Sequence, residues 1–262
     1  MTAPLTIGFV GTGTITAHIV RGLKASALAG WPVVLSPRNA GVARALAELP
    51  GVTVAEGNQQ VLDAADLVVL AVRPQVAETV IRALTFDPET PVISLIAATP
   101  ITRLQDWSGA RHICRAIPLP FVERQSGVTP VHPALPLALR LFGALGQALP
   151  VAESAAFDAY AAGSALMGTW FGIAETACNW LQAQGIPGPD ADTYLRALFA
   201  DLGDSLRHSP DALDRLRAAH STKGGLNEQL HQVFQAAGGG AALETGLNAV
   251  LARVRAAGSL TG

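Results

Sequence analysis

Two glycines near the amino end of the chain have the type and spacing to hold a phosphate group. Gly11 and Gly13 follow the apolar run 5–10 and precede a segment whose apolar residues repeat with helical spacing. A glycine at the first position permits a tight turn, and one at the second lets a pyrophosphate approach the amides that begin a helix. We therefore expect a dinucleotide to bind at Gly11, Gly13, Thr14 and Ile15. The alternative is a glycine turn in a sheet that binds no ligand.

The residues after the next predicted strand, 33–35, indicate which dinucleotide binds. An NAD site places an acidic side chain there for the ribose 2′-hydroxyl, but this sequence has Ser36, Pro37, Arg38 and Asn39. A carboxylate would repel a 2′-phosphate, whereas Arg38 can pair with it and Ser36 and Asn39 can donate hydrogen bonds. NADP(H) is therefore favoured over NAD(H). Alternatively, Arg38 is a solvated turn residue that stacks on adenine without selecting a phosphate.

The elements that must position these residues alternate between strand and helix as far as about residue 150. The predicted strands are 5–10, 33–35, 52–55, 67–72, 92–97, 112–117 and 127–131, and the predicted helices between them include 14–28, 40–49 and 74–84. Apolar strands separated by helices indicate a mainly parallel sheet that is covered on both faces. We predict an α/β fold whose amino-terminal part is a doubly wound domain of the Rossmann type.

The second part of the chain carries only helical patterns. Predicted helices cover 155–184, 190–207, 210–219, 226–237 and 241–256. The change of pattern predicts two domains, a dinucleotide-binding domain at 1–152 and an all-α domain for substrate binding and dimerisation at 153–262. Several apolar stripes on these helices exceed what one small core needs, and they predict a homodimer or a higher homo-oligomer.

Composition excludes several other classes of protein. The chain has 262 residues, of which 50% are hydrophobic and 15% charged, so it is expected to fold around a large core. Its 18 basic and 20 acidic residues offer no basic stripe for nucleic acid. Cys114 and Cys178 are far apart, and His208, His220 and His231 lack zinc-ligand spacing, so we expect no metal. Without a basic leader or a long apolar run, we expect a cytoplasmic protein that does not enter a membrane.

Four short segments, spread over nearly the whole chain, form a recognisable set. They are the glycine-rich start, Ala-Val-Arg-Pro at 71–74, Arg-Ala-Ile-Pro at 115–118 and Thr-Lys-Gly-Gly-Leu-Asn at 222–227. With these residues the chain resembles the pyrroline-5-carboxylate reductase family. The family's corresponding segments are Val-Lys-Pro, Arg-Ala-Met-Pro-Asn and Ser-Pro-Gly-Gly-x-Thr. The resemblance implies a Rossmann domain, a helical dimerisation domain and the NAD(P)H-dependent reduction of a cyclic imine carboxylate, as in the formation of proline from pyrroline-5-carboxylate.

The segment at 71–74 and the glycines at 224 and 225 are the next candidates for binding. Ligands of open α/β sheets bind at the carboxyl ends of the strands, so the cofactor's nicotinamide half is expected beside Ala71, Val72, Arg73 and Pro74. An anionic substrate needs N–H donors at the start of a helix, which is where two glycines precede the helix at 226–237. The expected substrate contacts are Pro118, Leu119, Lys223, Gly224, Gly225 and Asn227.

Three side chains are candidates for the chemistry itself. Glu175 aligns with an acidic position of the family and could orient the imine or a water, and Ser164 and Asn227 are hydrogen-bond donors. Alternatively, Glu175 is a surface carboxylate, and Ser164 is a small residue packed closely against another helix. The family's asparagine is Leu119 here, so a related imine is an alternative substrate.

Three rival functions share parts of this pattern. A β-hydroxyacid dehydrogenase has a similar layout, but the resemblance to that group would require a lysine in the long helix at 155–184, which contains none. A deazaflavin-dependent NADP reductase would not need so extended a helical second half. A dinucleotide-binding dimer without catalysis stays open, because a fold alone does not decide function.

Overall fold

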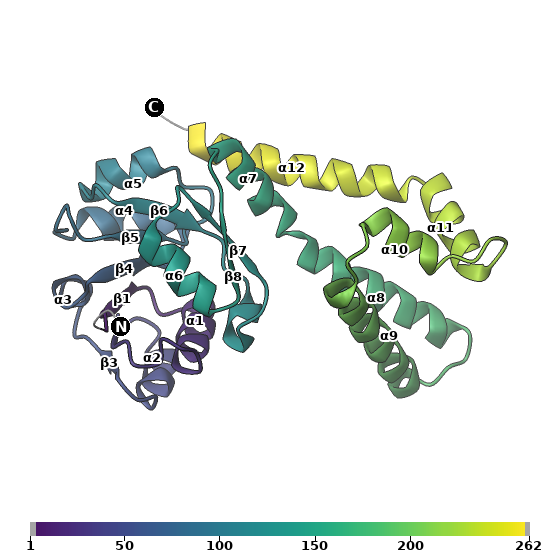
Figure 1. Cartoon of the computed structure of the whole chain (residues 1–262), viewed down its shortest axis with the longest axis horizontal. Helices are drawn as coiled ribbons and strands as arrows, with labels where there is room; N and C mark the ends of the chain where they lie inside the picture. The colour runs from purple at the N-terminus through teal and green to yellow at the C-terminus, as the bar shows by residue number, and fades with distance from the viewer. Residues whose placement is uncertain (1–3, 260–262) are drawn as a thin grey trace. The chain divides into compact units, whose positions relative to one another are not determined.

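The computed structural model describes residues 4–259, and it divides into two compact units. The first unit runs to Ala161 and includes the chain again from Leu251, and the second unit runs from Ala162 to Val250. We describe each by itself (Figure 1). The division into functional domains at residues 152 and 153 stays a prediction.

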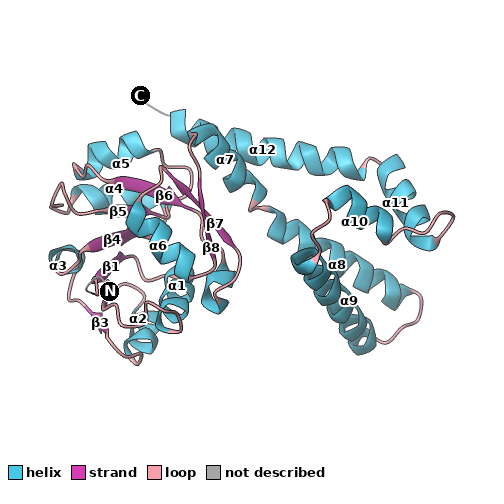
Figure 2. Ribbon diagram, in the orientation of Figure 1, coloured by secondary structure: helices cyan, strands magenta, loops and turns pink. Residues whose placement is uncertain are grey.

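The first unit is built on a sheet of eight strands within residues 4–259. The strands are β1 (Ile7–Val10), β2 (Val33–Leu35), β3 (Val52–Val54), β4 (Leu67–Leu70), β5 (Val92–Ser94), β6 (Ile113–Ala116), β7 (Val128–His132) and β8 (Gln147–Pro150). Their order is β3-β2-β1-β4-β5-β6-β7-β8, and every neighbouring pair is parallel except β6 and β7 (Figure 2). The predicted doubly wound, mostly parallel sheet is confirmed.

Helices cover both faces of this sheet (Figure 1). They are α1 (Thr14–Lys24), α2 (Ala40–Ala47), α3 (Asn58–Asp63), α4 (Pro74–Arg82), α5 (Ile101–Ser108) and α6 (Pro136–Ala144), with a short 3-10 helix, η1 (Pro120–Arg124). The helix α7 (Ser154–Gly163) follows β8. Along β4, Leu67 and Val69 belong to one buried cluster while Val68 and Leu70 belong to another. Successive side chains of a strand point to opposite faces, so an uninterrupted apolar strand requires helices on both sides.

The second unit consists of helices, as the sequence predicts. They are α8 (Leu166–Ala183), α9 (Gly188–His208), α10 (Leu213–Ala219), α11 (Leu226–Ala236) and the first part of α12 (Gly239–Ser259). Trp170 of α8 meets Phe199 of α9 edge to face, with ring centroids 5.3 Å apart. Neither α8 nor α11 has a buried residue, so this unit exposes much apolar surface.

One sequence prediction about the elements was wrong, and four elements had no prediction. The helix predicted at 155–184 is two helices, because Ser164 and Ala165 form a turn between α7 and α8, and the amide of Ala165 donates to the carbonyl of Ala162 at 3.1 Å. The sequence also gave no prediction of α3, α5, α6 or β8. These elements are short or lie at the edge of the sheet, where apolar periodicity is weak.

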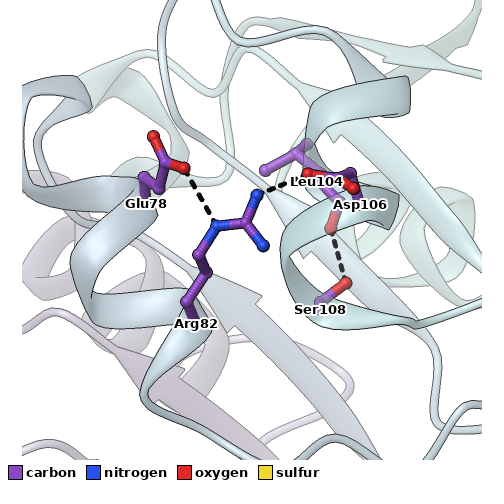
Figure 3. A network of polar contacts seen from close by, with 5 residues as sticks. All are labelled: Glu78, Arg82, Leu104, Asp106 and Ser108. Carbon is purple, nitrogen blue, oxygen red and sulfur yellow. Dashed lines mark hydrogen bonds and ion pairs between the residues drawn. The ribbon is translucent and has the colours of Figure 1, made fainter.

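The helices that follow β4 and β5 are joined by a polar network (Figure 3). At the end of α4, Arg82 donates to Glu78 on its own helix at 2.9 Å and to Asp106 on α5 at 2.5 Å. Ser108 closes α5 by donating to the carbonyl of Leu104 at 2.6 Å. These contacts fix the carboxyl end of the helix whose amino end carries the segment at 71–74.

Candidate functional site: a dinucleotide loop at the carboxyl edge of the sheet

The glycine loop lies between β1 and α1, beside the end of β4. Gly11 has φ +104°, and a Cβ atom there would lie 2.6 Å from the carbonyl oxygen of Ala71. A residue with a side chain would therefore be strained and would also clash with the neighbouring backbone. Gly13 precedes α1 in an extended conformation, and a Cβ atom there would meet nothing within 4 Å. The loop is thus tightly packed beneath Gly11 and open above Gly13, as close approach of a pyrophosphate requires.

Two buried hydroxyls hold this loop against the end of β2. The Gly11 amide donates to Oγ of Ser36 at 2.9 Å, and the Thr12 hydroxyl donates to the carbonyl oxygen of Ser36 at 2.7 Å. Ser36 is fully buried and Thr12 is 2% exposed. The sequence suggested Ser36 as a direct donor to a 2′-phosphate, but the structure places its hydroxyl beneath the loop. The sequence analysis did not identify Thr12 as a residue that holds the loop, because its partner Ser36 is 24 residues away in the sequence.

Arg38 and Asn39 follow β2 on the surface. Both side chains are exposed, and Asn39 adopts the left-handed conformation with φ 61° immediately before α2. No carboxylate occurs between Ser36 and Asn39. This edge of the loop thus offers an exposed guanidinium where an NAD site would offer an acid.

The segment at 71–74 lies directly beside the glycine loop. The Ala71 amide donates to the carbonyl of Val10 at 2.8 Å, which continues the pairing of β1 with β4. Ala71 and Val72 are half-buried, Arg73 is exposed, and Pro74 is the first residue of α4. Pro74 suits that position because the first residue of a helix has no intrahelical partner for an N–H group. The structure thus brings both predicted cofactor segments to one place.

Pro118 and Leu119 follow β6 at the same edge, because β1, β4, β5 and β6 are parallel. Pro118 is buried and Leu119 half-buried. The next residues form η1, which packs so closely on α1 that a Cβ atom at Gly22 would lie 2.2 Å from the carbonyl oxygen of Val122.

A small polar cluster joins α1 to η1. One carboxylate oxygen of Glu123 contacts Nδ1 of His18. The other lies 3.8 Å from Nη1 of Arg21. The helix that begins at the glycine loop is thus tied to the segment that carries Pro118 and Leu119. The ring of His18 thus lies against a carboxylate of η1.

The remaining predicted residues belong to the second unit. Gly224 has φ +72°, and its amide donates to the carboxylate of Glu228 at 2.6 Å. Asn227 donates from its side-chain amide to the carbonyl of His220 at 2.7 Å, and Lys223 is exposed. The structure therefore gathers Lys223, Gly224, Gly225 and Asn227 at the amino end of α11, and it adds Glu228 in the first turn of that helix, which the sequence analysis did not consider.

Ser164 and Glu175 lie apart from that turn in the chain. Ser164 is half-buried between α7 and α8, and Glu175 is exposed on α8. Among residues 4–259, no group of three histidine, cysteine, aspartate or glutamate side chains has the arrangement of a metal site. Within the same residues, no helix has the length and apolar character needed to cross a bilayer.

Comparison with known proteins agrees with this geometry. Residues 6–98 match the family model described as NADP oxidoreductase coenzyme F420-dependent, which covers the glycine loop and the segment at 71–74 and ends before the helical unit. A pyrroline-5-carboxylate reductase of Pseudomonas aeruginosa is 28% identical over 94% of this chain and 94% of its own length.

Solved structures share the fold over almost the whole chain. A pyrroline-5-carboxylate reductase of Coxiella burnetii superposes with a TM-score of 0.84 over 98% of this chain and 100% of its own, at 22% identity. The pyrroline carboxylate reductase of Plasmodium falciparum, with NADP bound, gives a TM-score of 0.80 over 97% of this chain and 98% of its own, at 14% identity. The chain is thus similar to pyrroline-5-carboxylate reductases in sequence along both lengths and in its fold.

Proposed function

We propose that this protein catalyses the NADPH-dependent reduction of a cyclic imine carboxylate, with pyrroline-5-carboxylate as substrate and proline as product. The observation that carries the proposal is the glycine loop packed against Ala71, in a chain that matches a pyrroline-5-carboxylate reductase over 94% of both lengths. Its place in metabolism would be amino-acid biosynthesis.

The residues at the loop fit a dinucleotide. A Cβ atom at Gly11 would collide with backbone while the space above Gly13 is open, so the amides at the start of α1 can receive a pyrophosphate. Gly13, Thr14 and Ile15 would bind it there, and the segment at 71–74 would border the nicotinamide. The bound cofactor supplies the hydride for the carbon of the C=N bond, while the protein orients the two partners.

The turn before α11 would bind the substrate carboxylate. Gly224, Gly225 and Asn227 carry N–H donors, and Lys223 adds a positive charge beside them. Because the Gly224 amide is held by Glu228, an incoming carboxylate has to displace that side chain. Pro118 and Leu119, in the first unit, are proposed as apolar contacts of the substrate.

The nitrogen of the reduced imine needs a proton, and three side chains are proposed around it. Glu175, Ser164 and Asn227 carry the groups that could orient the imine or a water. An iminium is already electrophilic, so no strong acid is required. These residues need only position the imine or a water.

NADPH is proposed as the preferred cofactor. Arg38 is exposed at the end of β2, and Asn39 beside it can donate a hydrogen bond to the same phosphate. A guanidinium pairs with phosphate in a bidentate manner and is always charged.

The Arg38→Ala variant tests this preference. A lost charge-assisted hydrogen bond is worth roughly 1.5–3 kcal/mol, so the KM for NADPH should rise about 10- to 100-fold while the KM for NADH stays within about twofold. Arg44→Ala, on the exposed face of α2, is the matched control and should leave both KM values unchanged. Equal losses for both cofactors would remove Arg38 from phosphate selection.

A homodimer and a cytoplasmic location are further parts of the proposal. Large apolar side chains of the second unit are exposed, among them Phe171 at 70%, Leu230 at 71% and Leu226 at 84%, and such surface is typical of subunit interfaces. Cys114 and Cys178 are free thiols, which supports a reducing compartment.

An assay panel distinguishes the proposal from its rivals. Neither α7 nor α8 contains the lysine that a β-hydroxyacid dehydrogenase would need. NADPH oxidation is followed with pyrroline-5-carboxylate, pyrroline-2-carboxylate and piperideine carboxylates, and small β-hydroxyacids are run with NADP⁺. Turnover of a cyclic imine supports the reductase, turnover of a hydroxyacid contradicts it, and tight NADPH binding without turnover favours a binding protein without catalysis.

A further inference from the structure

A carboxylate of the protein itself lies in the turn that is proposed to bind the substrate. Glu228 is half-buried in the first turn of α11, and one of its carboxylate oxygens accepts a hydrogen bond from the Gly224 amide at 2.6 Å. Gly224 has φ +72° and precedes the helix by two residues. The contact thus places a negative charge at the amino end of α11, where the helix dipole favours an anion.

Two other donors of this turn are held by carbonyl groups of the backbone. The Gly225 amide donates to the carbonyl of Thr222 at 2.8 Å, and a Cβ atom at Gly225 would lie 2.8 Å from the same oxygen. The side-chain amide of Asn227 donates to the carbonyl of His220 at 2.7 Å. These contacts close the turn, whereas the partner of the Gly224 amide is a side chain that can rotate away. A ligand therefore gains this amide by displacing a single side chain.

Glu228 departs from the usual way in which an acidic side chain caps a helix. Gly225 is the N-cap of α11, and an acid three residues later commonly accepts a hydrogen bond from the N-cap amide. That amide donates to Thr222 here, and Glu228 reaches one residue further back, to Gly224. A substrate carboxylate would compete for the Gly224 amide and would meet the charge of Glu228, and like charges at close range repel. In its present position Glu228 therefore opposes the binding of a carboxylate.

We propose that Glu228 is a specificity-determining residue that acts as an internal competitor of the substrate carboxylate. Its side chain binds the Gly224 amide, and a cyclic imine that carries a carboxylate gains this donor only when Glu228 moves away. A cyclic imine without a carboxylate does not need the donor and is not affected. This role of Glu228 rests on the proposed function, which assigns the turn to the substrate carboxylate.

The Glu228→Gln variant tests this competition in the reaction. Glutamine keeps an oxygen that can accept from the Gly224 amide, so the turn keeps its hydrogen bond and loses only the negative charge. Because a hydrogen bond to a charged group is stronger than a neutral one, the KM for pyrroline-5-carboxylate should fall about 10-fold, with kcat within about twofold. The KM for 1-pyrroline, which has the same ring without the carboxylate, should stay within about twofold. A residue that only caps the helix would not lower either KM.

Glu244→Gln provides the matched control. Glu244 is exposed on the part of α12 that belongs to the second unit, and it lies outside the turn before α11. The control variant loses the same charge from the same unit, and it should leave the KM for both imines unchanged. An equal fall of KM in both variants would overturn the proposal, because it would depend on the net charge of the unit and not on the contact with Gly224.

Binding of acetate tests the same competition without a reaction. The amide resonance of Gly224 is followed by NMR in the intact protein without cofactor or substrate, and sodium chloride keeps the ionic strength constant. Acetate should shift this resonance and should bind Glu228→Gln about 10-fold more tightly than it binds the wild type or Glu244→Gln. Glu228→Ala is the second variant: it removes the acceptor as well as the charge, and it should bind acetate at least as tightly as Glu228→Gln.

The two measurements separate the role of Glu228 from the proposed function. If Glu228→Gln reduces pyrroline-5-carboxylate with an unchanged or raised KM, the role of Glu228 is overturned and the proposed reaction stands. Equal acetate affinity in Glu228→Gln and Glu244→Gln would also overturn it. Tighter binding of acetate by Glu228→Gln, in a protein that reduces no cyclic imine, would support the competition at this turn and contradict the proposed reaction.

Discussion

At the scale of single residues, two glycines in one loop have separable roles. Gly11 is required by the fold itself, since it has φ +104° and lies under the Ala71 carbonyl. Gly13 has an extended backbone that any residue can adopt, and its surroundings are open. The space at Gly13 is therefore kept for a ligand.

The variants Gly11→Ala and Gly13→Ala should differ accordingly. Gly11→Ala should lower the free energy of unfolding by at least about 1–2 kcal/mol, the usual cost of a left-handed residue with a side chain. Gly13→Ala should unfold like the wild type but bind NADPH at least about 10-fold more weakly, because a methyl group occupies the approach to the α1 amides. Chemical denaturation and NADPH titration measure the two effects. A Gly13→Ala protein with unchanged NADPH affinity would contradict the assignment of the loop.

The two cysteines should also differ in reactivity. Burial raises the pKa of the Cys114 thiol to about 12, so almost none of it is thiolate near neutral pH. Cys178 is partly exposed on α8. At concentrations where the proposed dimer is dissociated, a thiol reagent at pH 8 should therefore modify one cysteine in the folded protein and two after denaturation. The Cys178→Ser variant is the control, and rapid labelling of that variant while folded would show that Cys114 is accessible.

At the scale of elements, the pair Arg115–Asp158 joins the sheet to α7. Asp158 accepts from Arg115 on β6, and Phe157 beside it packs under the same guanidinium. The partners are 43 residues apart in sequence, so the segment at 115–118 alone could not predict the pairing. The ion pair sets the position of α7 against the strand that leads to Pro118.

Removing one partner of this pair should be costly. Asp158→Ala leaves a buried guanidinium without its carboxylate, and the free energy of unfolding should fall by about 3–5 kcal/mol. The double variant Arg115→Met/Asp158→Leu should recover much of that loss, because it removes both charges together. Urea denaturation of both variants measures the difference. A loss of less than about 1 kcal/mol in Asp158→Ala would show that the pair does not hold α7 in place.

At the scale of the whole molecule, sequence predicts the parts of the fold whose residues are buried on both sides. The apolar strand at 67–70 required helices on both faces, and the sheet has them. The break at Ser164 was missed because alanine and glycine on both sides keep the apolar pattern of one helix. The buried place of Ser36 was missed because it depends on its tertiary contact with Thr12.

The exposed apolar surface of the second unit leads to a prediction about assembly. Phe171→Glu adds a charge to a helix with no buried residue, so it should convert the proposed dimer to a monomer without unfolding the first unit. Light scattering gives the mass, and activity is followed across dilution. A wild-type protein that is monomeric at all concentrations yet fully active would contradict the proposed dimer.

NADPH is proposed to bind at the glycine loop and to reduce a cyclic imine with its hydride. Calorimetric titration of the purified protein with NADPH, alongside the Gly13→Ala variant, tests the binding on which the rest depends. We expect saturable heat with one NADPH per chain in the wild type and at least about 10-fold weaker binding in the variant. The absence of heat with NADPH and also with NADH would contradict binding of a dinucleotide at this loop.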